Sequence, residues 1–191
     1  MDKLSNRELS CVASLGTLWG ISEITLGFIL HNAHVPFTGL IQTYIGTVIA
    51  LTALKLTGKR RSLIYSAIIA AVLKMLSFST IKIFPFIGIL LSAITGQAVI
   101  SVLGANLLGL VLSGGAMCCW PFAQSLLFYL LAYSSRFLDI YQIFLSKIGL
   151  VNMTVESLII WIFTIHFLLG MTAAGLSWRF AKSLRTKLGH D

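Results

Sequence analysis

Two side chains of opposite charge, Glu23 and Lys74, lie within long apolar segments of the sequence. A charge at the centre of a bilayer costs at least about 2.5 kcal/mol, so such side chains point into the protein and mark candidate functional sites. Each residue lies a few positions past the middle of its segment, and both segments are expected to run in the same direction. They therefore either form a structural ion pair at one depth or contact a solute; a free Glu23 would favour a cationic ligand and a free Lys74 an anionic one.

A pair of histidines, His31 and His34, follows the first apolar segment at a spacing of three residues. Two neutral imidazoles have the chemistry to bind nickel or cobalt. A metal site usually needs a third ligand, and the nearest sulfurs, those of Cys118 and Cys119, belong near the opposite surface. We therefore expect no resident metal and no cofactor, and we keep both histidines as candidate contacts of a small-molecule substrate.

Other polar and aromatic side chains fall inside the apolar segments or at their ends. Gln97, Gln124 and His166 are expected near the middle of the membrane, where each alone more often makes an interhelical hydrogen bond. Tyr44 and Trp161 are either walls of a pocket or anchors at the membrane interface. Several convergent polar groups with aromatic walls are typical of a small-molecule pocket. The predicted substrate-binding residues are Glu23, His31, His34, Tyr44, Lys74, Gln97 and Trp161.

The composition is that of an integral membrane protein. Of 191 residues, 57% are hydrophobic and only 10% are charged, which leaves little for a soluble domain. The net charge of +8 comes from Lys and Arg at the ends of apolar runs, a pattern that indicates membrane topology and not a nucleic-acid partner. Cys11, Cys118 and Cys119 fit small buried hydrophobic residues better than a disulfide framework.

The apolar runs predict a single all-α transmembrane domain, a six-helix bundle over residues 1–191. The break between the fourth and fifth spans is placed at Ser113-Gly114-Gly115, because adjacent glycines are the strongest turn signal in that run. The spans are expected at about 9–30, 38–56, 62–78, 86–112, 116–133 and 155–178.

Between the fifth and sixth spans, residues 134–154 place apolar side chains at helical spacing with polar ones between them. This pattern predicts an amphipathic outer helix that lies on the membrane surface and covers a site. Its apolar face is expected to hold Phe137, Ile140, Tyr141, Phe144, Leu145 and Ile148.

The basic residues outside the spans predict the orientation. With six spans and both termini in the cytoplasm, ten Lys and Arg side chains lie on the inner side and three, Lys82, Arg136 and Lys147, on the outer side. This bias follows the positive-inside rule. We therefore expect a multi-pass protein of the cell (inner) membrane with both termini cytoplasmic. The inner set is Lys3, Arg7, Lys55, Lys59, Arg60, Arg61, Arg179, Lys182, Arg185 and Lys187.

A stripe of small residues runs along one face of the first span. At about 100° per residue, Ala13, Gly16, Gly20, Glu23 and Gly27 share that face. Helices in lipid approach one another closely through such stripes. Glu23 is therefore expected to point at neighbouring helices and not at acyl chains.

Common catalytic motifs are missing from the sequence. It has no Gly-x-x-x-x-Gly-Lys-Ser/Thr phosphate loop, no His-Glu-x-x-His, no Gly-x-Ser-x-Gly and no pair of intramembrane aspartates. We therefore do not expect an enzyme, and the chain is not expected to hydrolyse ATP through a phosphate loop of this kind.

The combination of six spans in 191 residues, both ends inside, a small-residue stripe in the first span and an outward loop with proline and aromatic residues resembles the substrate-binding S component of energy-coupling factor (ECF) transporters. The resemblance implies a vitamin or related micronutrient as substrate, captured from outside, and a transmembrane coupling subunit and ATPase subunits as partners. It also implies that small residues of the first span dock on the coupling subunit, either Ala13 with Thr17 or Gly16 with Gly20.

Other classes of function stay open on the sequence alone. A self-contained permease for a small solute or for a metal ion such as cobalt or nickel would use Glu23 as a proton-coupled site. An assembly protein would use its small-residue stripes to bind other membrane helices and would have no ligand. An intramembrane enzyme is the least favoured class.

Overall fold

The computed structural model describes residues 3–35, 37–76, 83–134, 136–147, 149 and 153–187. Within these ranges the chain is helical with short connections and no strand, which confirms the predicted all-α class. The helices are α1 (Asn6–Asn32), α2 (Thr38–Thr57), α3 (Ser62–Met75), α4 (Ile83–Leu103), α5 (Leu107–Tyr133), α6 (Arg136–Lys147) and α7 (Val155–Lys187).

Five helices, α1, α2, α4, α5 and α7, are long and apolar enough to cross a membrane. The chain is therefore a multi-pass membrane protein by the length and composition of its helices. The helix of the predicted third span, α3, has 14 residues, which at 1.5 Å per residue extend about 21 Å. The predicted end of this span, after residue 76, lies outside the described residues.

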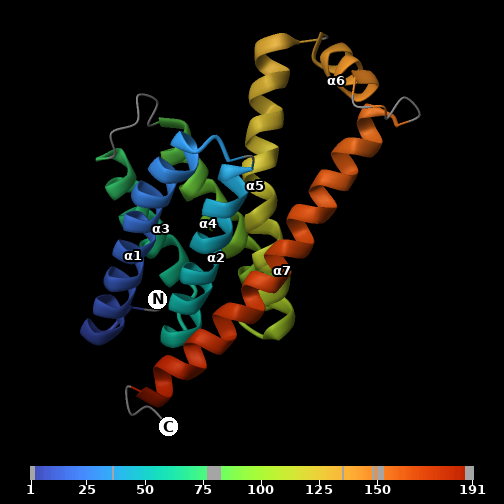
Figure 1. Cartoon of the computed structure of the whole chain (residues 1–191). Coiled ribbons are helices and arrows are strands. Elements are labelled where there is room, and N and C mark those ends of the chain that lie inside the picture. The colour runs from blue at the N-terminus through green and yellow to red at the C-terminus, as the bar shows by residue number, and fades with distance from the viewer. Residues whose placement is uncertain are drawn as a thin grey trace.

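Helix α2 occupies the centre of the bundle and packs against α1, α3, α5 and α7. The other long helices surround it, since α1 also packs on α3, α3 on α4, α4 on α5 and α5 on α7 (Figure 1). The half of α2 from Gly46 to Leu54 is almost entirely buried. Ala67, Ala70 and Ala71 of α3 are fully buried against this core, and small side chains there let the helices approach closely.

Helix α1 begins at a capping box and buries the small-residue face expected from the sequence. The hydroxyl of Ser5 accepts a hydrogen bond from the Glu8 backbone N–H at 3.3 Å, and the Glu8 carboxylate accepts one from the Ser5 N–H at 2.7 Å. A Cβ atom at Gly16 would lie 2.9 Å from the Ser66 carbonyl oxygen, and one at Gly20 would lie 2.8 Å from the Leu73 Cβ. These two glycines therefore set the close packing of α1 on α3.

The break between α4 and α5 lies at Gly104-Ala105-Asn106, so the turn predicted at Ser113-Gly114-Gly115 is wrong. Gly104 has a φ of +81°, a left-handed conformation that favours glycine. The Asn106 side chain then caps α5, because its Oδ1 accepts a hydrogen bond from the Gly109 N–H at 2.7 Å. The predicted spans 86–112 and 116–133 are replaced by α4 and α5 with the bounds given above.

The adjacent glycines instead form the contact between α5 and α7. Gly114 and Gly115 are buried in the first half of α5. A Cβ atom at Gly170 of α7 would lie 2.7 Å from the Gly115 Cα, and one at Gly115 would lie 2.6 Å from the Phe167 ring. The sequence feature that suggested a turn is therefore a helix-packing contact of the kind common in membranes.

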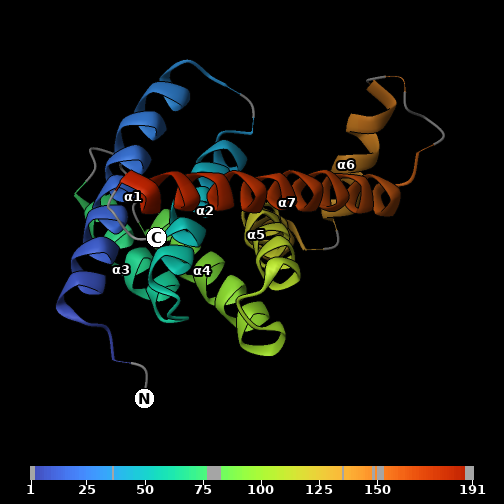
Figure 2. The same ribbon diagram turned by 90° about the horizontal axis from the view of Figure 1, so that it is seen from below.

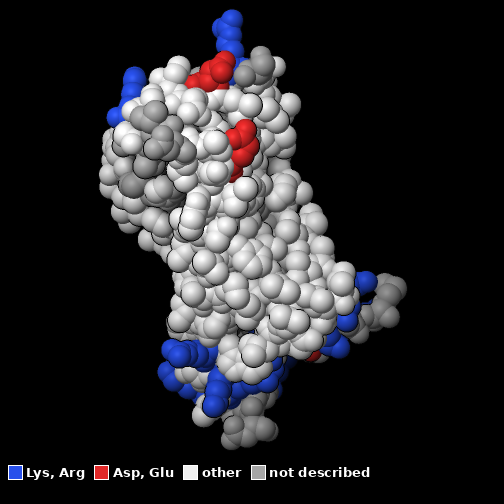
Figure 3. All heavy atoms as spheres, turned by 90° about the vertical axis from the view of Figure 1, so that its right-hand side faces the viewer, with Lys and Arg blue, Asp and Glu red and all other residues white. Residues whose placement is uncertain are grey.

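Charged side chains gather at the two ends of the bundle. We call the end where α1 begins and α7 ends the terminal end, and the opposite end, where α6 lies, the α6 end (Figures 1 and 2). Figure 3 shows a broad belt without charge between the two ends, with Lys and Arg concentrated at the terminal end. Lys55 of α2 contacts two residues of α7 there. Arg185 donates a hydrogen bond to the Lys55 carbonyl oxygen, and the Lys55 ammonium lies 3.6 Å from the centre of the Trp178 ring.

Helix α6 lies between α5 and α7 in the sequence, where a helix between the fifth and sixth spans is predicted. The second half of α5 and the first half of α7 extend beyond the other helices towards it (Figure 1). From Leu127 to Tyr133 every side chain of α5 is exposed. The side chains predicted to form the apolar face of α6 are not among those that the structure describes.

Candidate functional site

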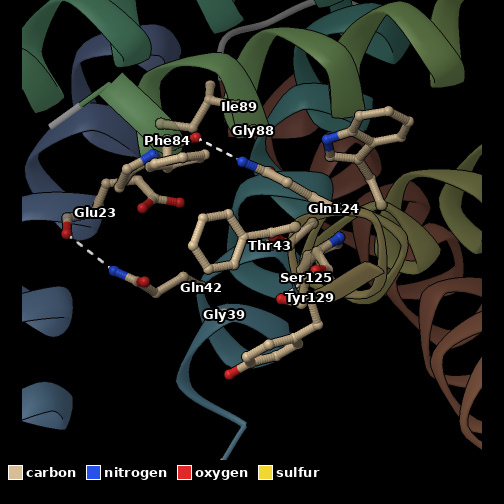
Figure 4. Close-up of a pocket in the computed structure, with 14 residues that line it drawn as sticks. Glu23, Gly39, Gln42, Thr43, Phe84, Gly88, Ile89, Gln124, Ser125 and Tyr129 are labelled. Atoms are coloured by element: carbon tan, nitrogen blue, oxygen red, sulfur yellow. Dashed lines mark hydrogen bonds between the residues drawn. The ribbon is translucent and has the colours of Figure 1, made fainter. Parts of the chain in front are cut away.

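A cavity of about 400 Å³ lies between α1, α2, α4 and α5 (Figure 4). It is in the half of the bundle nearer the α6 end, where α2 and α4 begin (Figure 1). Its size is that of a small-molecule site. The cavity is lined by Glu23, Gly39, Gln42, Thr43, Phe84, Pro85, Gly88, Ile89, Trp120, Pro121, Gln124, Ser125, Phe128 and Tyr129.

The carboxylate of Glu23 has two partners. One oxygen lies 3.4 Å from the Lys74 ammonium of α3, and the other accepts a hydrogen bond from the Trp19 indole N–H at 3.3 Å. Both charged residues are buried. Of the two alternatives for Glu23 and Lys74, the structure therefore shows the ion pair, and Trp19, which is also buried, belongs to the same cluster.

The backbone carbonyl of Glu23 is a second focus of hydrogen bonds. It accepts one from the Lys74 ammonium and one from the Gln42 amide nitrogen, the latter at 3.0 Å. Gly27, one turn further along α1, makes room for these donors, since a Cβ atom there would lie 2.8 Å from the Lys74 nitrogen and would also collide with the Gln42 amide. Side chains from α2 and α3 thus meet over one turn of α1.

On the opposite wall, Gln124 of α5 reaches across to α4. Its amide nitrogen donates a hydrogen bond to the Phe84 carbonyl oxygen at 2.9 Å (Figure 4). Gly88 allows this approach, because a Cβ atom there would lie 2.6 Å from the Gln124 carbonyl oxygen. As with Gln42, the partner is a backbone carbonyl, which only accepts, so the amide must present its nitrogen and keep its oxygen free for another donor.

Proline and aromatic residues form the apolar part of the wall. The rings of Phe84 and Phe128 meet edge to face with centroids 5.3 Å apart, and Phe128 lies 5.9 Å from Tyr129. Pro121 lies within α5. Because proline has no N–H, the Met117 carbonyl one turn before it is free, and the Ser92 hydroxyl of α4 donates to it at 3.3 Å.

Trp120 is the one lining residue with an unpaired buried donor in the described part of the chain. Its indole nitrogen is buried and has no hydrogen-bond partner there. Buried indole N–H groups usually find an acceptor. This donor therefore lies beside the cavity with its hydrogen-bonding capacity unused.

The histidines His31 and His34 lie outside this cavity, in the connection between α1 and α2. They line a separate hollow of about 500 Å³ together with Asn32, Phe37 and neighbouring residues. Both are exposed, and the His34 Nδ1 lies 3.0 Å from the Asn32 carbonyl oxygen. Among the described residues, His, Cys, Asp and Glu side chains form no cluster of three or more that could hold a metal ion.

Three further residues expected at the site are placed elsewhere. The Tyr44 hydroxyl pairs with that of Thr172 on α7 at 3.1 Å. Gln97 lies near the terminal end of α4, where its amide nitrogen donates to the Ser101 hydroxyl at 3.4 Å. Trp161 is 60% exposed on α7. The cavity lining includes none of them, and of the predicted substrate-binding set it includes Glu23, with Lys74 directly behind it.

The structure separates the two alternatives for the docking stripe of α1. Gly16 and Gly20 are buried where α1 packs on α3, so these two positions face another helix of the same chain. Thr17 is exposed and Ala13 is partly exposed. The pair Ala13 and Thr17 therefore stays available for docking.

Sequence reasoning missed most of the cavity wall. Gln124 was noted as a polar group within the membrane, but Gln42 and Thr43 lie close to the start of α2, where polar residues are unremarkable. The helical spacing of Gly39, Gln42 and Thr43 was the available signal, since it places three small or polar residues on one face.

Comparisons with models of known protein families, with curated proteins and with solved structures find no match to this chain.

Proposed function

We propose that this protein is the substrate-capture subunit of a multi-subunit importer, in the manner of the S component of ECF transporters. The observation that carries the proposal is the cavity of about 400 Å³ with the buried Glu23–Lys74 pair in its wall. A closely packed structural bundle has no need of such a hollow, because protein interiors are close-packed. The substrate is a vitamin or related micronutrient small enough for this space.

The orientation that we propose has both termini in the cytoplasm of a cell whose inner membrane holds six spans, α3 included. It is supported by the concentration of Lys and Arg at the terminal end (Figure 3). The cavity then lies in the outer half of the membrane, close to α6. Capture from outside follows from this placement, and α6 is suited to cover the entrance.

The mechanism consists of binding and conformational exchange without covalent chemistry. Energy would come from ATPase subunits through a transmembrane coupling subunit, and α1 is suited to dock on the latter. Its outward face combines Ala13 and Thr17 with exposed apolar residues such as Leu18 and Ile21. Small residues beside apolar ones permit close helix contact in lipid.

Native mass spectrometry of the gently purified protein tests this function. We expect a bound small molecule in the wild type and its loss when the cavity is filled. We also expect a coupling subunit and ATPases to copurify from native membranes. Uptake by the chain alone in liposomes would instead identify a self-contained permease, and absence of both ligand and coupling module would contradict the proposal.

A further inference from the structure

We infer that the cavity takes an uncharged ring compound that carries a carboxamide or hydroxyl group. This inference rests on the proposed function, because it assigns a substrate class to the same cavity. It follows from three properties of the wall: its charge balance, its unused hydrogen-bonding groups and its aromatic surface.

The charge balance disfavours a charged ligand. Glu23 is the one Asp, Glu, Lys or Arg residue among the described residues that line the cavity. Its carboxylate is already matched by the Lys74 ammonium at 3.4 Å, and that ammonium lies behind the wall. A net charge on the ligand would therefore find no free counter-charge and would lose hydration against the apolar wall, which is costly.

The hydrogen-bonding groups favour a neutral polar ligand. The amide nitrogens of Gln42 and Gln124 are held by the carbonyl oxygens of Glu23 and Phe84. Their amide oxygens are therefore the acceptors that the wall offers to a ligand N–H or O–H group. Thr43 and Ser125 add hydroxyl groups that both donate and accept. A carboxamide or hydroxyl group on the ligand matches this set.

The remaining wall favours a flat ring. Phe84, Phe128 and Tyr129 form a continuous series of ring contacts, and Trp120 and two prolines complete the apolar surface. Aromatic walls bind planar rings through offset or edge-to-face contacts. The volume of about 400 Å³ suits a compound of one or two rings.

Three probes of nearly equal shape test whether the cavity prefers an uncharged ligand. Benzamide is neutral, benzoate is an anion and benzamidine is a cation, and each is a phenyl ring with one planar group. Binding to the protein in lipid nanodiscs is measured by ligand-detected NMR, with empty nanodiscs as the reference for partition into lipid. We expect benzamide to bind and both charged probes to bind at least about tenfold more weakly.

Variants of the ion pair reverse the preference if the charge balance determines it. Lys74→Met leaves an unpaired carboxylate and should favour benzamidine, whereas Glu23→Gln leaves an unpaired ammonium and should favour benzoate. The double variant has neither charge and should restore the order of the wild type, which keeps the test valid if a single variant folds poorly. Glu156→Gln and Lys182→Met, at exposed positions, are the matched controls and should leave the order unchanged.

Equal or tighter binding of a charged probe by the wild type would overturn the inference, as would the absence of benzamide binding. Different results would contradict the proposed function. A charged small molecule found by native mass spectrometry would refute the substrate class but would still support ligand capture. If benzamide binds but no coupling subunit or ATPase copurifies, the importer is refuted and the binding site is still supported.

Discussion

The Lys74 ammonium of α3 lies 3.4 Å from the Glu23 carboxylate of α1, and both side chains are buried. These residues are 51 positions apart in the sequence, so the pair joins α1 to α3. It also fixes the Glu23 carboxylate at the edge of the cavity. Removing one partner leaves the other charge unpaired in a medium of low dielectric constant.

The single variants Glu23→Gln and Lys74→Met should each reduce the free energy of unfolding by about 3–5 kcal/mol. The double variant should lose less than the sum of the two, because no charge is then left without a partner. The free energies are measured by denaturant titration in mixed micelles. Lys182→Met, which removes an exposed ammonium, should change stability by less than about 0.5 kcal/mol. Strict additivity would show that the two charges do not interact.

Gly170→Ala should destabilise the protein by about 1–3 kcal/mol, because the new methyl group forces α5 and α7 apart. The added Cβ atom would lie 2.7 Å from the Gly115 Cα. Gly175→Ala on the same helix is the matched control, since nothing lies within 4 Å of its added Cβ atom. Thermal unfolding monitored by circular dichroism measures both, and equal effects would refute the close contact.

Asn106→Ala should cost about 1 kcal/mol, because the side chain that caps α5 is lost. Asn106→Ser retains an oxygen that accepts a hydrogen bond from the helix N-terminus and should keep most of the stability. Unfolding titrations of the two variants give the comparison. If both variants behave alike, the Asn106 cap at 2.7 Å from the Gly109 nitrogen does not contribute to stability.

Gly39→Phe should abolish ligand capture and leave the fold intact, because the ring occupies part of the cavity. Gly39 lines the cavity, and a Cβ atom there meets only the Pro121 Cβ, at 3.6 Å. The copurifying small molecule is quantified by native mass spectrometry, and the unfolding temperature is measured alongside. Gly175→Phe adds the same ring at an open position and should retain the ligand. A ligand bound equally by both variants would place the binding site elsewhere.

Thr17→Trp should weaken association with the proposed coupling subunit without loss of stability, because Thr17 is exposed on α1. A large ring there prevents the close approach that small residues allow. Thr164→Trp, at an exposed position of α7, is the control. The amount of coupling subunit that copurifies with each variant is compared with the wild type. Unchanged association of Thr17→Trp would exclude this face of α1 as the docking surface.

Much of the fold could be predicted from hydropathy, because each apolar run is long enough to be recognised by itself. The bounds of α2 and the start of α7 lie within a residue or so of the expected spans. The break at Gly104 was missed because two kinds of glycine look alike in a sequence. Gly114 and Gly170 are needed for close helix contact, whereas Gly104 is needed for its positive φ. Only the packing of α5 on α7 distinguishes them.

The candidate site was less predictable. The similar depth of Glu23 and Lys74 suggested an ion pair as one of two alternatives, because a buried charge needs a partner at its own level. The positions of Tyr44, Gln97 and Trp161 depend on how each helix is rotated about its axis, and weak amphipathicity in a membrane helix leaves that rotation undetermined from sequence. A cavity depends in addition on where helices separate, which local patterns do not encode.

Because the Glu23 and Lys74 charges cancel, and no other Asp, Glu, Lys or Arg is buried in the described residues, this part of the bundle carries no net charge through the hydrophobic belt. Moving one unpaired elementary charge across the membrane potential takes about 2.3 kcal/mol per 100 mV. A protein that moves with both charges paired and an uncharged cargo avoids that electrical work. If the proposed function holds, capture and release of the cargo should therefore proceed equally well in energised and in depolarised cells.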